Sequence, residues 1–166
     1  MLDTGESDIV AAMATIACEL QYSFDYFHWT GFYRTFQQKG APSLYMNTGK
    51  KRYEQTWLKI GPYQGKHGCL RIPAGKGVCG QALAEERTLN VPDVHTHPGH
   101  IACASSTQSE IVIPVWANDR SVVIGVLDVD SDIKAAFTAE DTEGLEAICR
   151  LLSDCSFDTA SIPILE

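Results

Sequence analysis

The sequence has few basic residues and no long apolar run. Its 13 Lys and Arg residues stand against 21 Asp and Glu residues, which gives a formal net charge of -8. Nucleic acids and anionic membranes bind clustered Lys and Arg, so neither is expected as a partner. No apolar run approaches the ~20 residues of a membrane-spanning helix. The acidic start, MLDTGESDIV, lacks the basic segment of a signal peptide, so we expect a cytoplasmic protein.

The sequence also lacks a C-x-x-C pair, although it contains 6 cysteines. This absence removes the spacing typical of a zinc ribbon. A permanent disulfide framework is not expected in a reducing compartment. The thiols therefore divide into buried small side chains and reactive groups. Cys18, Cys149 and Cys155 fall on predicted helices and are interpreted as structural.

No internal repeat, low-complexity tract or second domain is indicated, and 166 residues suffice for one domain with a full core. Apolar residues at helical spacing predict a helix over 7–21 and another from Thr138, where Thr-Ala-Glu-Asp forms a capping box. Between them the pattern predicts strands and one short helix. This order predicts an α+β sandwich with a mostly antiparallel sheet. The strands are expected at 28–36, 57–61, 70–72, 110–116 and 121–130, and the short helix at 77–86.

Two connections are long. Residues 37–51 are polar and contain Gly, Pro and Asn, which predicts a surface insertion. Residues 86–109 exceed an ordinary connection, so we expect this loop to cover a pocket on one face of the sheet.

The segment GKGVCG matches G-x-G-x-x-G at Gly75, Gly77 and Gly80. It is a weak signal for dinucleotide binding, because Pro73 interrupts the preceding strand and no βαβ unit surrounds it. The glycines are interpreted as a tight turn that leaves Cys79 near a helix N-terminus. There the helix dipole is expected to lower the pKa of the thiol.

The segment HTHPGHIAC contains four metal-capable side chains, those of His95, His97, His100 and Cys103. A zinc site needs a closed tetrahedral set, which this spacing does not provide, so a polar loop is favoured and no metal site is predicted. Cys103, beside His100, is the strongest candidate for an activated and accessible thiolate.

Three acidic residues lie at predicted strand ends: Glu110, Asp128 and Asp130. Asp128 and Asp130 are two positions apart on a strand and therefore share one face. They are either solvated acids at the rim of the core, or groups that bind an ammonium or donate a proton. With thiols opposite, at Cys69, Cys79 and Cys103, they suggest redox chemistry on a small cationic or zwitterionic molecule.

The chain resembles the free methionine-(R)-sulfoxide reductases, enzymes built on a single GAF domain. The resemblance covers roughly the central two-thirds of the chain and includes the three cysteines of the family. The matching segments are WTGFY at 29–33, GPYQGKHGC at 61–69, RIPAGKGVCG at 71–80, VPDVHTHPGHIAC at 91–103, SEIVIP at 109–114 and GVLDVDS at 125–131.

The resemblance implies a role for each cysteine. Cys103 is expected to attack the sulfoxide sulfur and to become a sulfenic acid. Cys69 is expected to resolve it as a disulfide, which requires Cα atoms within about 7 Å or a loop movement. Cys79 is expected to be an auxiliary thiol near the substrate. Thioredoxin is implied as the reductant, with no bound cofactor.

The resemblance also implies a substrate pocket. Glu110, Asp128 and Asp130 would bind the ammonium group and assist protonation of the departing oxygen. Trp29 and Tyr33 would line the methyl-sulfinyl pocket, with Gln64 nearby.

The alternative is a GAF module that binds a nucleotide or another small ligand as a sensor, without turnover. Such sensors are usually joined to output domains, and none is expected here, so residues 1–166 are interpreted as one GAF domain. The oligomeric surface stays open, with a homodimer as the candidate assembly.

Overall fold

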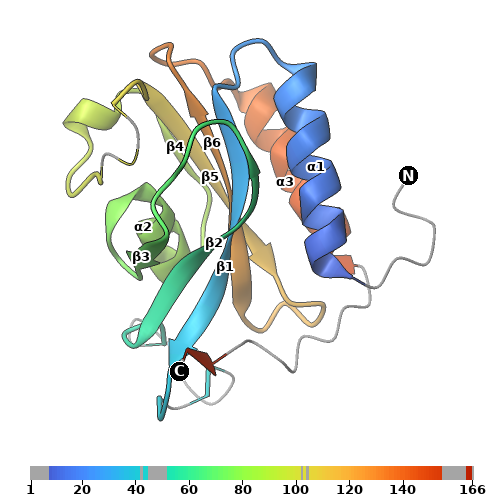
Figure 1. The fold of residues 1–166 in the computed structure, drawn as a ribbon, viewed down its shortest axis with the longest axis vertical. Coiled ribbons are helices and arrows are strands. Elements are labelled where there is room, and N and C mark those ends of the chain that lie inside the picture. The colour runs from blue at the N-terminus through green and yellow to red at the C-terminus, as the bar shows by residue number, and fades with distance from the viewer. Residues whose placement is uncertain are drawn as a thin grey trace.

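One sheet separates two layers of helix (Figure 1) in the computed structural model, which describes residues 8–41, 43–44, 52–101, 103, 105–154 and 164–165. The strands follow the order β3-β2-β1-β6-β5-β4, all antiparallel, and β7 pairs in parallel with β1 off that path. The strands are β1 (Trp29–Gln38), β2 (Thr56–Gln64), β3 (Arg71–Pro73), β4 (Leu89–Val91), β5 (Ser109–Trp116), β6 (Val123–Ser131) and β7 (Ile164–Leu165). The helices are α1 (Ile9–Ser23), α2 (Gly77–Glu85), the 3-10 helix η1 (Val94–Thr96) and α3 (Ala139–Asp154).

The two faces of the sheet have different covers. Helices α1 and α3 lie side by side on one face, which we call the helix face, and α2 lies on the opposite face, which we call the pocket face (Figure 1). Successive side chains of a strand point to opposite faces. Leu127 and Val129 of β6 therefore join the core under α1 and α3, whereas Val126 joins the core under α2.

The two helices of the helix face begin at side-chain caps. Asp8 Oδ1 accepts a hydrogen bond from the Val10 backbone N–H at 2.8 Å, before α1. The predicted capping box of α3 is confirmed, since Thr138 N donates to Asp141 Oδ2 at 2.7 Å and Asp141 N donates to Thr138 Oγ1 at 3.3 Å. No helix in the described ranges has both the length and the apolar character needed to cross a membrane.

The predicted order of elements is confirmed, with differences at the ends. Strand β1 continues to Gln38, so the predicted insertion begins later than residue 37, and Leu44 within it is fully buried. Residues 42 and 45–51, like Cys155, lie outside the described residues. The patterns missed β4 and η1 inside the loop 86–109, and β7. Leu151 is 53% exposed, because it lies off the α3 face that buries Leu145 and Leu152.

Candidate active site

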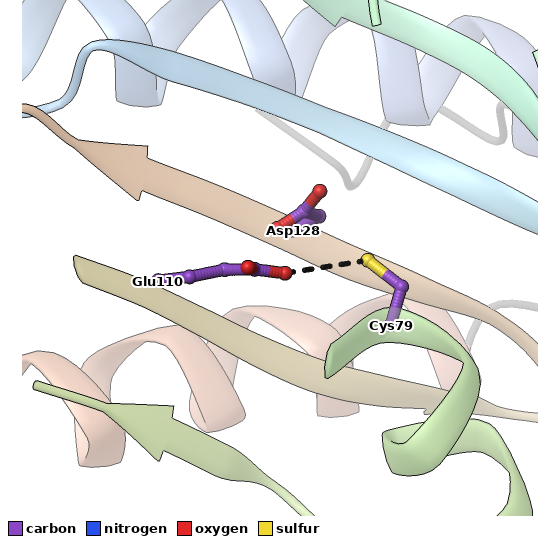
Figure 2. Close-up of side chains that lie close together, drawn as sticks. All are labelled: Cys79, Glu110 and Asp128. Carbon is purple, nitrogen blue, oxygen red and sulfur yellow. Dashed lines mark hydrogen bonds between the residues drawn. The ribbon is translucent and has the colours of Figure 1, made fainter. Parts of the chain in front are cut away.

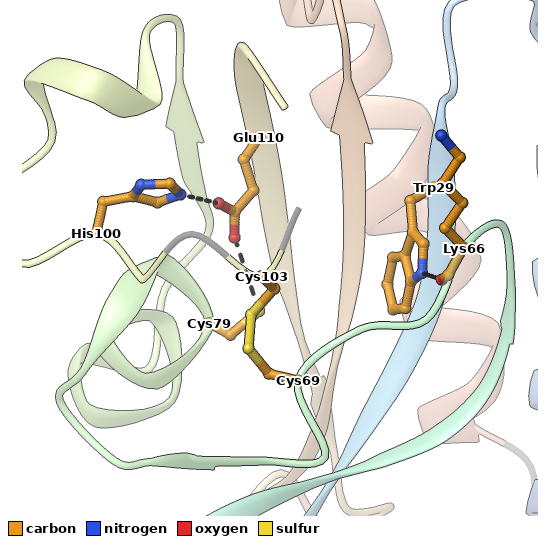
Figure 3. The surroundings of a disulfide bond; sticks show 7 residues. All are labelled: Trp29, Lys66, Cys69, Cys79, His100, Cys103 and Glu110. Atoms are coloured by element: carbon orange, nitrogen blue, oxygen red, sulfur yellow. Dashed lines mark hydrogen bonds and ion pairs between the residues drawn. A yellow bond between two sulfur atoms is a disulfide. The ribbon is translucent and has the colours of Figure 1, made fainter. Parts of the chain in front are cut away.

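A disulfide joins Cys69 to Cys103 (Figure 3). Cys69 belongs to the connection between β2 and β3, and Cys103 belongs to the long loop that leads into β5. The two residues are 34 positions apart in sequence, and their Cα atoms lie 5.3 Å apart. The expected Cα separation below about 7 Å is therefore confirmed. Both cysteines are half-buried and pack against the core of the pocket face.

The three predicted acids are brought together by the pairing of β5 and β6. Glu110 lies directly opposite Asp130, and Val112 lies opposite Asp128, which places Asp128 diagonally across from Glu110. All three carboxyl groups project from the pocket face, and Glu110 and Asp128 are each only 6% exposed. The prediction that Asp128 and Asp130 share one face is confirmed.

Burial dominates the protonation of these acids. Desolvation raises the pKa of Asp128 from 3.8 to about 7. Desolvation, followed by repulsion from neighbouring carboxylates, raises the pKa of Glu110 and of Asp130 well above the usual range. Near neutral pH the cluster therefore keeps protons, and a carboxyl that keeps its proton can act as a general acid.

Helix α2 brings Cys79 to the carboxyl cluster. The Cys79 thiol donates to Glu110 Oε1 at a Sγ–O distance of 3.8 Å (Figure 2). Helix α2 packs closely on Pro73 at Gly80, where a Cβ atom would collide with the Pro73 carbonyl oxygen. The predicted lowering of the Cys79 pKa is wrong. Burial, and then the charges of Asp128 and Glu110, raise it well above its ordinary value and outweigh the helix dipole.

The histidines of the long loop have separate surroundings. His100 Nε2 lies 3.8 Å from Glu110 Oε2 (Figure 3). Burial lowers the pKa of His100 and raises the pKa of Glu110, so both shifts disfavour a charged pair at this contact. His97 Nε2 lies 2.9 Å from Gln81 Oε1. In the described ranges the metal-capable group is instead Cys79, Glu110 and Asp128.

The predicted aromatic residues form a stack beside the acids. The Trp29 ring stacks on Tyr33 and Tyr63 with centroid distances of 5.9 and 5.3 Å, and its Nε1–H donates to the Lys66 carbonyl at 2.8 Å (Figure 3). Burial, and then the charge of Asp128, raise the pKa of the Tyr33 hydroxyl. Gln64 ends β2 and is half-buried.

A cavity of about 20 Å³ lies between the disulfide and the acids. The expectation that loop 86–109 covers a pocket is confirmed, since His100, Ile101, Cys103 and Thr107 form part of the wall. The wall also includes Cys79 and the three acids, but Cys69, Trp29, Tyr33 and Gln64 are outside it in this disulfide-bonded state. The lining residues are Ile72, Gly77, Val78, Cys79, His100, Ile101, Cys103, Thr107, Glu110, Asp128 and Asp130.

Comparison with known proteins identifies the family. The GAF domain family matches residues 8–155. The chain is 37% identical over 147 residues to the free methionine-R-sulfoxide reductase of Escherichia coli, covering 89% of this chain and 77% of that protein. The chain belongs to the GAF-domain family of free methionine-R-sulfoxide reductases.

Other relatives agree with this assignment. GAF domain-containing protein A of Dictyostelium discoideum is 40% identical over 151 residues, covering 91% of this chain and 83% of that protein. The free methionine-R-sulfoxide reductase from Neisseria meningitidis, solved in complex with its substrate, aligns with a TM-score of 0.73 at 38% identity, covering 89% of this chain and 77% of that chain. The resemblance and the single GAF fold predicted from the sequence are confirmed.

Two cavity residues of this free methionine-R-sulfoxide reductase family member were missed by sequence reasoning. Thr107 is 4% exposed, and its side chain opposes the rise in the pKa of Asp130. Nothing in the polar run SSTQSE distinguishes Thr107 from its neighbours. Ile101 packs over Gly77 and is 38% exposed. The one signal that could have identified Ile101 was its position between His100 and Cys103.

Proposed function

We propose that this protein reduces free L-methionine-(R)-sulfoxide to methionine, with Cys103 as the nucleophile. The observation that carries the proposal is the Cys69–Cys103 disulfide beside three carboxyl groups, two of them buried, in a chain of this family. A sulfoxide reduction needs a soft nucleophile at sulfur, an acid at oxygen and a second thiol to remove the sulfenic acid.

The reductive step transfers two electrons from Cys103 to the sulfoxide. The Cys103 thiolate attacks the sulfoxide sulfur and the sulfur–oxygen bond breaks. A buried carboxyl protonates the oxygen, which forms a new bond to Cys103 Sγ. The transient bond between Cys103 Sγ and the substrate sulfur breaks, so methionine leaves and Cys103 becomes a sulfenic acid. The Cys69 thiol then attacks the sulfenic sulfur, and water is released as the disulfide forms. Cys79 keeps its proton and serves as an auxiliary donor to Glu110 rather than as a nucleophile.

Substrate binding assigns a second role to the acids. The ammonium group of the free amino acid pairs with carboxylates among Glu110, Asp128 and Asp130, because the described residues of the cavity wall include no Lys or Arg. Trp29 and Tyr33 would contact the methyl-sulfinyl group, with Gln64 close by. Sites that hold small molecules have volumes of about 300 Å³ or more, and this cavity has about 20 Å³. The disulfide state is therefore closed, and substrate enters after reduction.

Recycling uses a dithiol protein such as thioredoxin, in the cytoplasm, without a bound cofactor. Both disulfide cysteines are half-exposed, and the adjacent Leu70 is 72% exposed, which gives a partner protein access to the sulfur atoms. The partner thiolate attacks one sulfur of the disulfide, and its second thiol completes the exchange. The homodimer stays a prediction, to be tested by light scattering.

The direct test couples turnover of free methionine-(R)-sulfoxide to thioredoxin, thioredoxin reductase and NADPH. Oxidation of NADPH that depends on this protein and on the sulfoxide supports the proposal. Binding of a small ligand without NADPH oxidation, and without methionine formation under dithiothreitol, would favour the alternative GAF sensor.

A further inference from the structure

Three buried donor atoms converge from separate elements on the pocket face. Cys79 Sγ from α2, a carboxyl oxygen of Glu110 from β5 and one of Asp128 from β6 all lie within 4.8 Å of one another (Figure 2). Zn²⁺ binds thiolate sulfur and carboxylate oxygen at about 2.0–2.3 Å, so donor atoms in a filled tetrahedral site lie about 3.5 Å apart. Side-chain movements of the order of 1 Å would close this set around an ion.

A second observation points to a cation at the same place. Asp128 is 6% exposed, and its Oδ1 atom is buried without a hydrogen-bond partner among the described residues. A buried carboxylate oxygen without a donor is costly, and a cation would satisfy it. Among the described residues, the wall of the cavity that Asp128 lines has three carboxyl groups and no Lys or Arg.

The same wall offers a fourth ligand and enough room. Imidazole nitrogen is a common zinc ligand. His100 Nε2 lies 3.8 Å from Glu110 Oε2 but outside the set of three mutually close donors, so His100 would have to move toward the ion to bind it. A cavity of about 20 Å³ can hold an ion or one water, but not an amino acid. The mixture of thiolate, imidazole and carboxylate favours a thiophilic ion such as Zn²⁺ or Cd²⁺ over Mg²⁺ or Ca²⁺, which take oxygen ligands.

We propose that Cys79, Glu110, Asp128 and His100 bind one thiophilic divalent cation, and that this ion competes with the ammonium group of the substrate. Binding releases to solvent the proton of the Cys79 thiol and those held by the carboxyl groups. The competition rests on the proposed function, whereas the binding of the ion does not. The sequence patterns predicted no metal site, because these four residues come from four separate segments.

The binding test uses the oxidised protein, in which Cys69 and Cys103 are not available as thiolates. Titration calorimetry with Zn²⁺ is expected to give one ion per chain, with a heat that varies with the buffer because protons are released. Cd²⁺ is expected to produce the ultraviolet thiolate-to-metal absorption band. Cys79→Ser should abolish the band and weaken binding at least about 100-fold, since even outer-shell changes cost about 10–100-fold in affinity.

Matched controls separate this site from adventitious binding. Cys149→Ser removes a buried thiol from the helix face and should bind Zn²⁺ as the wild type does. Asp128→Asn should weaken binding without unfolding, because an amide replaces a carboxyl of the same shape. Wild-type affinity in Cys79→Ser, or a Cd²⁺ complex without the thiolate band, overturns the site.

Competition is measured on a double variant, Cys69→Ser with Cys103→Ser, which keeps Cys79 and cannot turn over. The apparent Kd for Zn²⁺ should rise in proportion to the concentration of free methionine sulfoxide. Substrate binding to this variant with no change in the Zn²⁺ affinity overturns the competition. If methionine sulfoxide does not bind at all, the proposed function fails, and the Zn²⁺ titration still decides whether the metal site exists.

Discussion

The helix face and the pocket face share the same strands but bury different chemistry. Under α1 and α3, β5 and β6 present Ile111, Ile113, Leu127 and Val129 to an apolar core. On the pocket face the intervening positions include Glu110 and Asp128, the two buried acidic side chains of the described residues. The difference shows that the alternation of a single strand can supply fold stability on one side and a reactive site on the other.

Two buried thiols make the same contrast. Cys79 on α2 and Cys149 on α3 are both almost fully buried, and burial raises the pKa of each. Cys79 also faces Asp128 and Glu110, whereas Cys149 lies in the apolar core of the helix face. Burial alone therefore does not distinguish the two thiols, whereas their neighbouring groups do.

The largest expected effect comes from the proposed nucleophile. Cys103→Ser should lower turnover to below a few per cent of wild type with any reductant, because a hydroxyl is a poor nucleophile toward sulfur. Cys149→Ser should leave kcat/KM near wild type and reduce only stability. Methionine formation under dithiothreitol measures both, and substantial activity in Cys103→Ser would remove this residue from the role.

The second effect concerns the ammonium pocket. Free methionine-(R)-sulfoxide should be preferred over its N-acetyl amide by ~10³ or more in kcat/KM, because the acylated nitrogen leaves buried carboxylates unpaired. Asp128→Asn should lower kcat/KM for the free amino acid and narrow this ratio. Equal kcat/KM values for the two substrates in the wild type would contradict the pairing of ammonium with acids.

The third effect separates the two disulfide partners. Cys69→Ser should still form one methionine per enzyme in a single turnover, but its thioredoxin-coupled rate should fall at least about ten-fold, since thioredoxin attacks a disulfide. Quenched single-turnover experiments and NADPH oxidation measure the two quantities. If Cys69→Ser recycles with thioredoxin as fast as wild type, Cys69 is not the resolving thiol.

A variant on the helix face should lower stability and leave activity unchanged. Leu145→Ala empties part of the core under α3, where Leu145 is 3% exposed, and should lower the free energy of unfolding by about 2–5 kcal/mol. On the same helix Leu151→Ala, at a half-exposed position, should cost less than about 0.5 kcal/mol. Urea unfolding measures both changes, and kcat/KM should stay near wild type. Loss of activity in folded Leu145→Ala would show that the two faces are coupled.

The last prediction is a pH dependence of stability. The pKa of Asp128 is raised from 3.8 to about 7 in the folded protein, so its stabilising contribution is complete below pH 3.8 and is lost as pH rises toward 7. Asp128→Asn should therefore match wild type near pH 4 and exceed it near pH 8 by at most about 4 kcal/mol. Urea unfolding at the two pH values measures this. Parallel pH profiles for variant and wild type would show that Asp128 is ionised throughout.

From the sequence we could predict those helices and strands that have strong local patterns, and those site residues that lie on one strand. The capping box at Thr138 and the alternation around Asp128 depend on near neighbours, so both could be recognised. The direction of the Cys79 pKa shift could not be predicted. The position of Cys79 near a helix N-terminus is visible in the local sequence, but the carboxyl groups that raise its pKa come from β5 and β6. Strand β4 and Thr107 were missed for a similar reason: their partners are strands or acids distant in the chain.

The hydrogen bond from the Trp29 indole to the Lys66 carbonyl makes this tryptophan an intrinsic fluorescence probe of the site. Lys66 is three residues before Cys69, so only a short segment connects the indole to the disulfide. The chain has 3 tryptophans, and replacing Trp57 and Trp116 with Phe leaves Trp29 as the single emitter. Its fluorescence would then follow the redox state of the site in real time, during turnover and without an added dye.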